Sequence, residues 1–346
     1  CVTLARLELA HGNPAAARER LTSVLGQRGV PREAYELLAE AARSLGDATT
    51  RLRALRGLIA HAKDGPVRLH AELELARQLG EIGRSREGLA HAAAATRGLP
   101  RGSDEHVDAA RTWLALAVTV DDPRQEAAAR LELRQTLGAE LSAKELRAEA
   151  LLLAERLEDP TGARQVIEAG LLTRPADELL LSTLKHLAQP LGSLEPYLDA
   201  LDAAVEGMVP GTDRDRLASE LALSAAELGD APRTHRALER MTLAAGDGEE
   251  LLDLRDWAVQ VLGLQEQELR RLDERLRTGP AAPGLLRRLS RLVGEGEPLV
   301  EHLLAQTRQA DPETAIRLSE TALALAEPQR SSSLCMRALR LALTGQ

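Results

Sequence analysis

The carboxylates best placed for metal chemistry in this chain form one short acidic run, DDPRQE at residues 121–126. Adjacent carboxylates on a helix can hold the Mg²⁺ ions that bind a diphosphate. A site of that kind also needs a second metal-binding motif and aromatic walls, whereas the chain has no Phe, two Trp and two Tyr. Asp122 before Pro123 is also a common way to begin a helix, because Asp caps free N–H groups and Pro needs none. The run therefore predicts a helix cap and not a metal site.

The other residues that could do chemistry are dispersed. No two of the eight histidines are three or four residues apart, the two cysteines lie at opposite ends, and neither GxSxG nor GxGxxG occurs. Zinc needs three or four converging ligands, and phosphate loops need glycines and a lysine at fixed spacing. We predict no metal, no cofactor and no enzymatic activity. An all-α enzyme stays as an alternative that would require carboxylates converging in a pocket.

Arginine is concentrated between residues 270 and 291. Seven arginines there stand against four acidic residues, Glu266, Glu268, Asp273 and Glu274, which leaves a local charge of +3. Such a stretch is usually a solvated helix face with partners one turn away. As a hypothesis, six of the arginines form a docking surface for an acidic partner: Arg270, Arg271, Arg275, Arg287, Arg288 and Arg291.

The composition predicts an all-α protein. Ala, Leu, Arg and Glu, which favour helices, dominate, and the β-branched and aromatic residues typical of strands are sparse. The net charge of −9 argues against binding along a nucleic-acid backbone, which needs clustered positive charge. No apolar run approaches the roughly 20 residues of a membrane span. The preference for Arg over Lys and the abundance of Ala suggest a bacterial source.

The ends of the sequence bear on location. The chain begins with Cys1 instead of Met, and its helical pattern starts at once. We interpret it as a segment of a longer protein and favour the cytoplasm. Because the native N-terminus would then be missing, a periplasmic or lipoprotein-anchored location is the alternative.

The opening residues 4–25 predict two helices joined by a tight turn. Leu4, Ala5, Leu7 and Leu9 recur at helical spacing, Gly12 can adopt the positive φ that ends a helix, and Asn13-Pro14 can begin the next. Ala17, Leu21 and Val24 then form a stripe that faces the first helix. Two such helices cannot bury their stripes alone and need neighbours.

Comparable turns recur along the whole sequence. They lie at residues 12, 46, 83, 121, 158, 192, 229, 263, 310 and 345, at intervals of 34 to 38 except for one of 47. This period predicts one solenoid over residues 1–346, a right-handed superhelix of about nine or ten antiparallel helix hairpins, with the first helix of each pair on the concave side. The long interval contains a predicted extra helix, residues 285–293, and predicts a kink or phase slip at 278–298.

The repeated unit resembles the tetratricopeptide repeat, in which small residues and Leu occupy fixed points around a Gly-Asp or Gly-Asn turn. The match is degenerate, since the family's aromatic positions are mostly Leu or Ala here, except Tyr35. The residues that carry it are Leu4, Ala5, Gly12, Ala17 and Leu21; Leu75, Ala76, Gly83, Gly88, Ala95 and Pro100; Ala163, Ile167 and Pro175; Leu221, Ala222, Gly229 and Leu238; and Ala315 and Ala322.

The resemblance implies a non-catalytic scaffold or adaptor that binds a protein or peptide along its groove. With few aromatic anchors, we expect that groove to use Arg, Glu and Leu. Asn13 is the only Asn, so a grip on a peptide's terminal carboxylate through several Asn is not expected. The alternative is the sensor or regulatory arm of a larger signalling protein or transcriptional activator.

Overall fold

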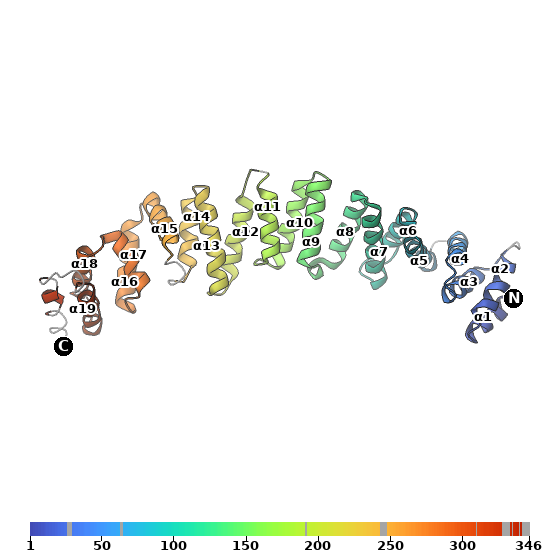
Figure 1. Cartoon of the computed structure of the whole chain (residues 1–346), viewed down its shortest axis with the longest axis horizontal. Coiled ribbons are helices and arrows are strands. Elements are labelled where there is room, and N and C mark those ends of the chain that lie inside the picture. Colours follow the sequence, from blue (N-terminus) through green and yellow to red (C-terminus); the bar gives the residue numbers. More distant parts are fainter. Residues whose placement is uncertain are drawn as a thin grey trace. The chain divides into compact units, whose positions relative to one another are not determined.

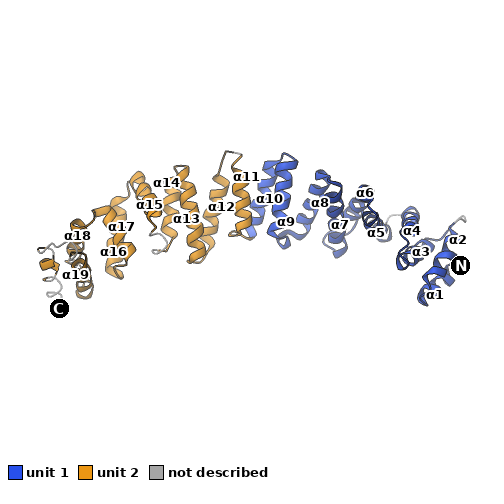
Figure 2. Ribbon diagram, in the orientation of Figure 1, with its two compact units in different colours: residues 1–173 blue, residues 174–346 orange. Residues whose placement is uncertain are grey.

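The chain is all-α, as its composition predicts. The computed structural model describes residues 1–25, 30–62, 65–190, 192–242, 248–308, 310–326, 333, 335–338 and 340, and the regular elements within these ranges are helical. Nineteen α-helices, α1 to α19, follow one another in the described part of the chain (Figure 1). Two compact units divide the chain, residues 1–173 and 174–346 (Figure 2), and each is described by itself.

Unit 1 is a stack of helix hairpins in which most helices pack against the next one in the sequence. A 3₁₀ turn, Gly138–Glu140, precedes α9, and a π-helical segment, Leu152–Arg156, follows it. The helices of unit 1 are α1 (Val2–Ala10), α2 (Pro14–Val24), α3 (Arg32–Ser44), α4 (Ala48–His61), α5 (Pro66–Glu81), α6 (Ser85–Gly98), α7 (Asp104–Val120), α8 (Pro123–Leu137), α9 (Ala143–Leu151) and α10 (Pro160–Thr173).

Unit 2 continues the same kind of stacking. Its helices are α11 (Glu178–Ala188), α12 (Glu195–Gly207), α13 (Thr212–Glu227), α14 (Ala231–Arg240), α15 (Glu249–Leu262), α16 (Gln265–Thr278), α17 (Pro283–Val293), α18 (Glu297–Thr307) and α19 (Pro312–Ala326). The repeating hairpins within each unit confirm the predicted all-α fold of stacked helix hairpins.

The turns predicted from the sequence are where the backbone becomes left-handed. Eight predicted positions have positive φ, between 54° and 76°: Gly12, Gly46, Gly83, Asp121, Glu158, Gly192, Gly229 and Gly263. Asp121 and Glu158 adopt this conformation although it is unusual for residues with a side chain. The predicted turn at Gly345 lies outside the described residues.

Aspartates after these turns begin the following helices. The side chain of Asp47 accepts a hydrogen bond from the backbone N–H of Thr50 at 3.0 Å, and Asp230 accepts one from the N–H of Arg233 at the same distance. Asp159 and Asp311 cap α10 and α19 in the same way. Each cap satisfies N–H groups that have no partner inside the helix.

Alanine and leucine make up most of the core. Ala5, Ala17 and Leu21 are fully buried between α1 and α2, as the repeat pattern predicts. Leu4 and Leu7, however, are about half exposed, at 45% and 52%, so the expectation that they join the inner stripe was wrong. The helix α1 packs against α2 and α3, and its buried residue is Ala5.

The long interval between the turns at 263 and 310 holds three helices, α16, α17 and α18, whereas a regular interval holds two. The predicted extra helix, residues 285–293, corresponds to α17. The contacts in this interval are not limited to consecutive helices, because α16 contacts both α18 and α19. Asp273 bonds His302 at 2.7 Å, and Arg317 donates to the carbonyl oxygen of Leu276 at 2.8 Å. The kink at 278–298 stays a prediction.

Charged side chains join successive hairpins. On α12 and α14 of unit 2, Arg233 pairs with Glu195 at 2.9 Å and with Asp199 at 2.8 Å, and Arg240 pairs with Asp202. The paired residues lie 34 to 38 positions apart, which is one repeat. The ion pairs therefore fix the register between neighbouring hairpins.

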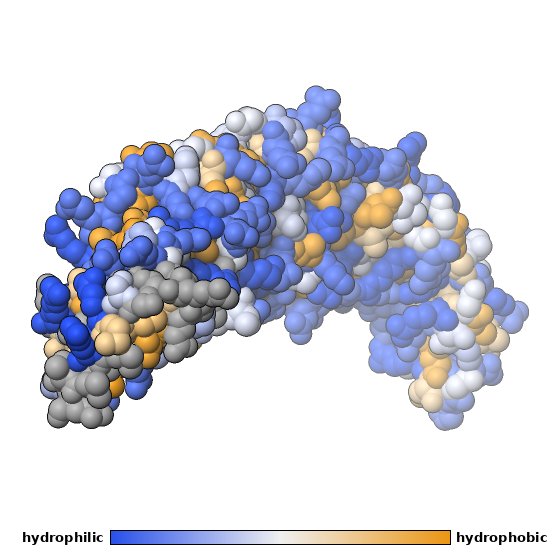
Figure 3. All heavy atoms as spheres, turned by 60° about the vertical axis from the view of Figure 1, so that its left-hand side comes forward, coloured by the Kyte–Doolittle hydropathy of each residue, from blue (hydrophilic) through white to orange (hydrophobic). Residues whose placement is uncertain are grey.

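The visible surface is mainly hydrophilic, with apolar residues in separate spots (Figure 3). Among the described residues, the large apolar side chains with the greatest exposure are Leu172 and Val209, at 85% and 84%. Within the described ranges, no helix combines the length and the apolar character needed to cross a bilayer.

Gly57 should be essential for the close packing of α3 on α4. A Cβ at this position would lie 2.1 Å from Cε1 of Tyr35, whose ring is buried. We expect Gly57→Ala to lower the free energy of unfolding by about 1–3 kcal/mol through overpacking, although Ala favours helices. Chemical denaturation followed by circular dichroism measures this change. Gly207→Ala is the control, because its new Cβ meets nothing within 4 Å, and its free energy of unfolding should be unchanged or higher. An equal change in the free energy of unfolding for both variants would refute the packing argument.

The cap at Asp47 predicts a pH-dependent contribution to stability. Hydrogen bonds from the Thr50 side chain and backbone hold the pKa of the Asp47 carboxyl below its usual range. Because the folded-state pKa is the lower one, the stabilisation is present above the unfolded-state pKa and is lost as pH falls through the folded-state pKa.

We expect Asp47→Ala to cost about 1 kcal/mol near neutral pH. The difference from the wild type should shrink as pH falls below about 4, the ordinary pKa of Asp. Denaturation curves across this pH range provide the measurement. Asp47→Asn keeps an acceptor for the cap and should lose much of the pH dependence; a difference that stays constant down to acid pH would contradict this prediction.

Candidate functional site

The acidic run at residues 121–126 is a helix start. Asp122 accepts hydrogen bonds from the N–H groups of Arg124 and Gln125, both at 3.1 Å. Asp121 is the left-handed residue that ends α7, and its carboxylate pairs with Arg156 at 2.8 Å. Asp122 is therefore the helix cap that the sequence predicts, whereas Asp121 forms an exposed ion pair.

The six arginines proposed as a docking surface lie in different environments. Arg270 and Arg287 are exposed, and Arg275 is half-buried. Arg288 is buried, whereas Arg271 pairs with Glu239 and Arg291 pairs with Asp253 at 2.5 Å and Asp256 at 3.0 Å. Arg271 and Arg291 thus have ion-pair partners within unit 2, and docking through the six arginines stays a prediction.

The structure also brings together a cluster that the sequence analysis missed. His235 and Glu239 lie one turn apart on α14, and Glu268 joins them from α16. Their ligand atoms lie within 4.8 Å of one another, and they are the one such group among the described His, Cys, Asp and Glu residues. The sequence signal was the pair His235 and Glu239 at i, i+4; only the fold adds the third member.

Two arginines already neutralise this cluster. Arg255, only 3% exposed, donates to Glu239 at 2.5 Å and lies 3.6 Å from Glu268. Arg271 contacts the same two carboxylates. Burial, followed by the charges of Arg255 and Arg271, lowers the pKa of His235. Two guanidinium groups balance two carboxylates, and a divalent cation would have to displace them. We interpret the cluster as a structural ion network between α14, α15 and α16.

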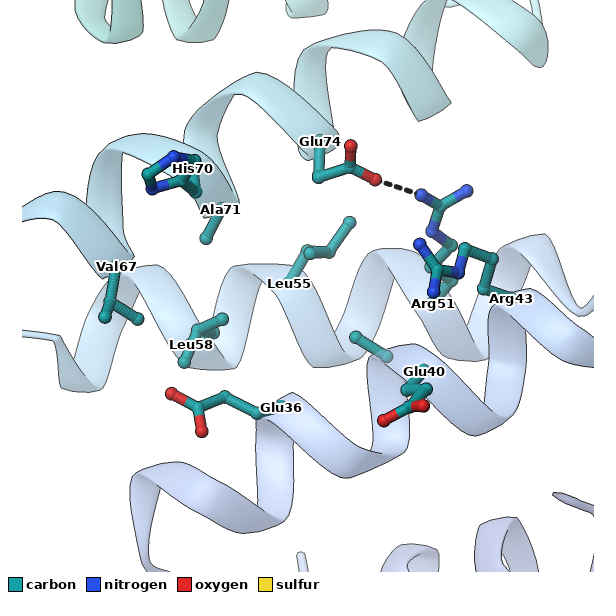
Figure 4. Close-up of a pocket in the computed structure, with 11 residues that line it drawn as sticks. Glu36, Glu40, Arg43, Arg51, Leu55, Leu58, Val67, His70, Ala71 and Glu74 are labelled. Carbon is teal, nitrogen blue, oxygen red and sulfur yellow. Dashed lines mark hydrogen bonds and ion pairs between the residues drawn. The ribbon is translucent and has the colours of Figure 1, made fainter. Parts of the chain in front are cut away.

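A cavity of about 350 Å³ opens in unit 1 between three successive helices (Figure 4). We call it the α3–α5 notch. One wall is α3, the floor is α4 and the other wall is α5. The side chains that line it include Glu36, Ala39, Glu40 and Arg43 from α3; Arg51, Leu55 and Leu58 from α4; and Val67, His70, Ala71 and Glu74 from α5.

Local packing positions the walls of the α3–α5 notch. Tyr35 lies against Gly57 and stacks on His61, with ring centroids 4.8 Å apart, which holds α3 on α4. Arg51 pairs with Glu74 and donates to Gln78 at 2.7 Å, which ties α4 to α5 (Figure 4). The notch is therefore built on helices and has a fixed geometry.

A second cavity, of about 480 Å³, occupies the corresponding place in unit 2, between α11, α12 and α13. We call it the α11–α13 notch. Tyr197 is buried there and donates a hydrogen bond to Glu220; burial, with Glu220, raises the pKa of this phenol. Lys185 lies 3.4 Å from Glu220 and over the Tyr197 ring. The sequence analysis identified neither notch, since each needs residues from three helices.

Comparisons with solved structures return helical repeat proteins. No protein-family model and no curated protein matches the sequence. A tetratricopeptide repeat protein from Parabacteroides merdae is 13% identical, with 89% of this chain and 98% of that chain covered and a TM-score of 0.34. MamA is 14% identical over 49% of this chain and 93% of that chain, with a TM-score of 0.32.

A structure of Naa15/Naa10 bound to HypK-THB is 14% identical, covers 91% of this chain and 58% of that chain, and has a TM-score of 0.41. At these scores the neighbours are similar to this chain in being helical repeats, and the assignment of the fold rests on the hairpins and left-handed turns described above.

The ion network of α14, α15 and α16 should depend on Arg255. Replacing it with Ala leaves the buried Glu268 and the half-buried Glu239 with less compensation, and we expect the free energy of unfolding to fall by about 3 kcal/mol. Thermal or chemical denaturation of the full chain measures the loss. Arg270→Ala removes an exposed pair with Glu266 and should change stability by less than about 1 kcal/mol. If Zn²⁺ instead stabilised the wild-type chain and Arg255→Ala cost nothing, the cluster would be a metal site.

Proposed function

We propose that this chain is a non-catalytic interaction scaffold that binds a segment of a protein partner, with the α3–α5 notch as a principal contact. The observation that carries the proposal is this notch, a cavity with an apolar floor and charged walls formed by consecutive hairpins. In a stack of hairpins such a cavity adjoins exposed faces of further helices. This arrangement suits an extended or helical ligand.

The burial of the aromatic residues supports a mode of recognition in which the partner contributes the large side chain. Tyr35, Tyr197 and Trp113 are at most 9% exposed, so they serve the core and are not available as anchors, and Trp257 is half-buried. Interfaces depend on a few large side chains that enter pockets. Here the scaffold supplies the pocket, and the partner supplies the large side chain.

Charged groups at the notch support a polypeptide ligand over a purely apolar one. The walls carry Glu36, Glu40 and Arg43 beside the apolar floor of Leu55 and Leu58. An apolar side chain can fill the floor while its flanking residues meet the charges. Interfaces of this kind have an apolar centre and a polar rim.

Selection of a random peptide library on the full chain tests this function. We expect enriched peptides to bind the wild type and to bind Ala39→Trp at least about tenfold more weakly, a loss of about 1.4 kcal/mol. The new indole would occupy the cavity between α3 and α5. Fluorescence anisotropy with labelled peptides measures the affinities.

Ala115→Trp is the matched control, because Ala115 is exposed on α7 outside the notch. Circular dichroism confirms that each variant is folded, and His70→Trp offers a second way to obstruct the mouth. Peptides that bind both obstructed variants as tightly as the wild type would place recognition elsewhere. Failure to enrich any peptide would argue against the scaffold function itself.

A further inference from the structure

We propose that the α3–α5 notch selects a basic segment, in which a Lys or Arg flanks a large apolar side chain. This inference rests on the proposed function and adds the chemistry of the partner. It follows from which charges at the notch are already neutralised inside the protein and which are not.

The α5 wall has no charge to offer a partner. Glu74 pairs with Arg51 from the floor and with Arg77 from its own helix at 3.1 Å. Arg51 in turn is occupied by Glu74 and Gln78. These groups balance one another and would bind a charged ligand only after breaking existing contacts.

The α3 wall is different. Glu36 and Glu40 lie one helical turn apart and both face the cavity (Figure 4). Two carboxylates at this spacing repel each other unless cations intervene. Glu36 pairs with Arg32 at 3.0 Å, but that arginine side chain is 55% exposed, so the contact is weak. No ion pair involves Glu40 within the described part of the chain.

The remaining cation of the lining lies away from Glu36. Arg43 is near Arg51, three residues after Glu40 on α3 (Figure 4). The lining carries three carboxylates, Glu36, Glu40 and Glu74, against these two guanidinium groups, so a ligand that spans the notch meets its most negative potential beside Glu36. A Lys or Arg of the partner can reach both carboxylates, whereas an Asp or Glu placed there would be repelled.

The floor determines the second half of the selected motif. Leu55 and Leu58 line it, with Val67 and Ala71 on the adjoining wall. A cavity of about 350 Å³ has room for one large aliphatic or aromatic side chain. Burying that side chain supplies most of the affinity, and the basic neighbour supplies specificity.

The notch in unit 2 shows that this charge pattern is not a general property of the repeat. The α11–α13 notch has four charged groups, and all four are in ion pairs: Arg216 with Glu178, and Lys185 with Glu220. Its walls carry no carboxylate pair comparable to Glu36 and Glu40. The difference between the two notches is therefore Glu40, a lining carboxylate for which the described lining of the α11–α13 notch has no counterpart.

Sequencing the peptides selected from the random library tests the inference. We expect enrichment of Lys or Arg within four residues of a large apolar residue. The enriched peptides should bind a Glu36→Gln, Glu40→Gln double variant about three- to tenfold more weakly, because each exposed ion pair contributes modestly. Raising the salt concentration should weaken wild-type binding more than binding to the double variant.

Glu19→Gln is the matched control, since Glu19 is an exposed glutamate on α2 outside the notch. It should leave the affinities unchanged. Enriched peptides without basic residues, or peptides that bind the double variant as tightly as the wild type, would overturn this inference. If those same peptides still failed to bind Ala39→Trp, the proposed scaffold function would survive. If no peptide were enriched, both this inference and the proposed scaffold function would be overturned.

Discussion

Every helix of this chain depends on burying a narrow stripe of alanine and leucine against its neighbours in the stack. Ala17, Ala54 and Ala92 have no exposed surface, and the chain contains no Phe. Small side chains let helix backbones approach closely, and Gly57 does so against the ring of Tyr35. A single hairpin cannot bury enough apolar surface by itself. The hairpins therefore stack, and the two cavities described above are open notches between successive helices.

Arginine has a structural role that explains its abundance. Arg233 and Arg240 join α14 to α12, and Arg291 joins α17 to α15. A repeat places charges of opposite sign on neighbouring hairpins at about the same height, so long arginine side chains can bridge them. The arginine stretch at 270–291 partly follows this pattern. It has the composition of a docking surface, yet Arg271 and Arg291 use their charges within unit 2.

The notches link the fold to the proposed scaffold function. Both lie where two first helices and the intervening second helix meet, and both have apolar floors with charged walls. The two notches differ in how their charged side chains are paired. The charged side chains of the α11–α13 notch are in ion pairs, whereas Glu40 of the α3–α5 notch has no ion pair among the described residues. A repeat protein with buried aromatics can thus acquire selectivity by altering a few charges on one wall, without changing its core.

The sequence by itself determined the class of fold, the positions of the turns and the helix caps. These are local features: a left-handed turn favours Gly, and an N-cap needs a short polar side chain such as Asp, Asn or Ser within three residues of free N–H groups. The period even located Asp121 and Glu158, which have positive φ without being Gly. Tertiary structure alone decided the outward position of Leu4 and Leu7, the network of Arg255 with Glu239 and Glu268, and both notches. These features depend on how each helix is rotated about its axis against helices from other hairpins, which local sequence does not specify.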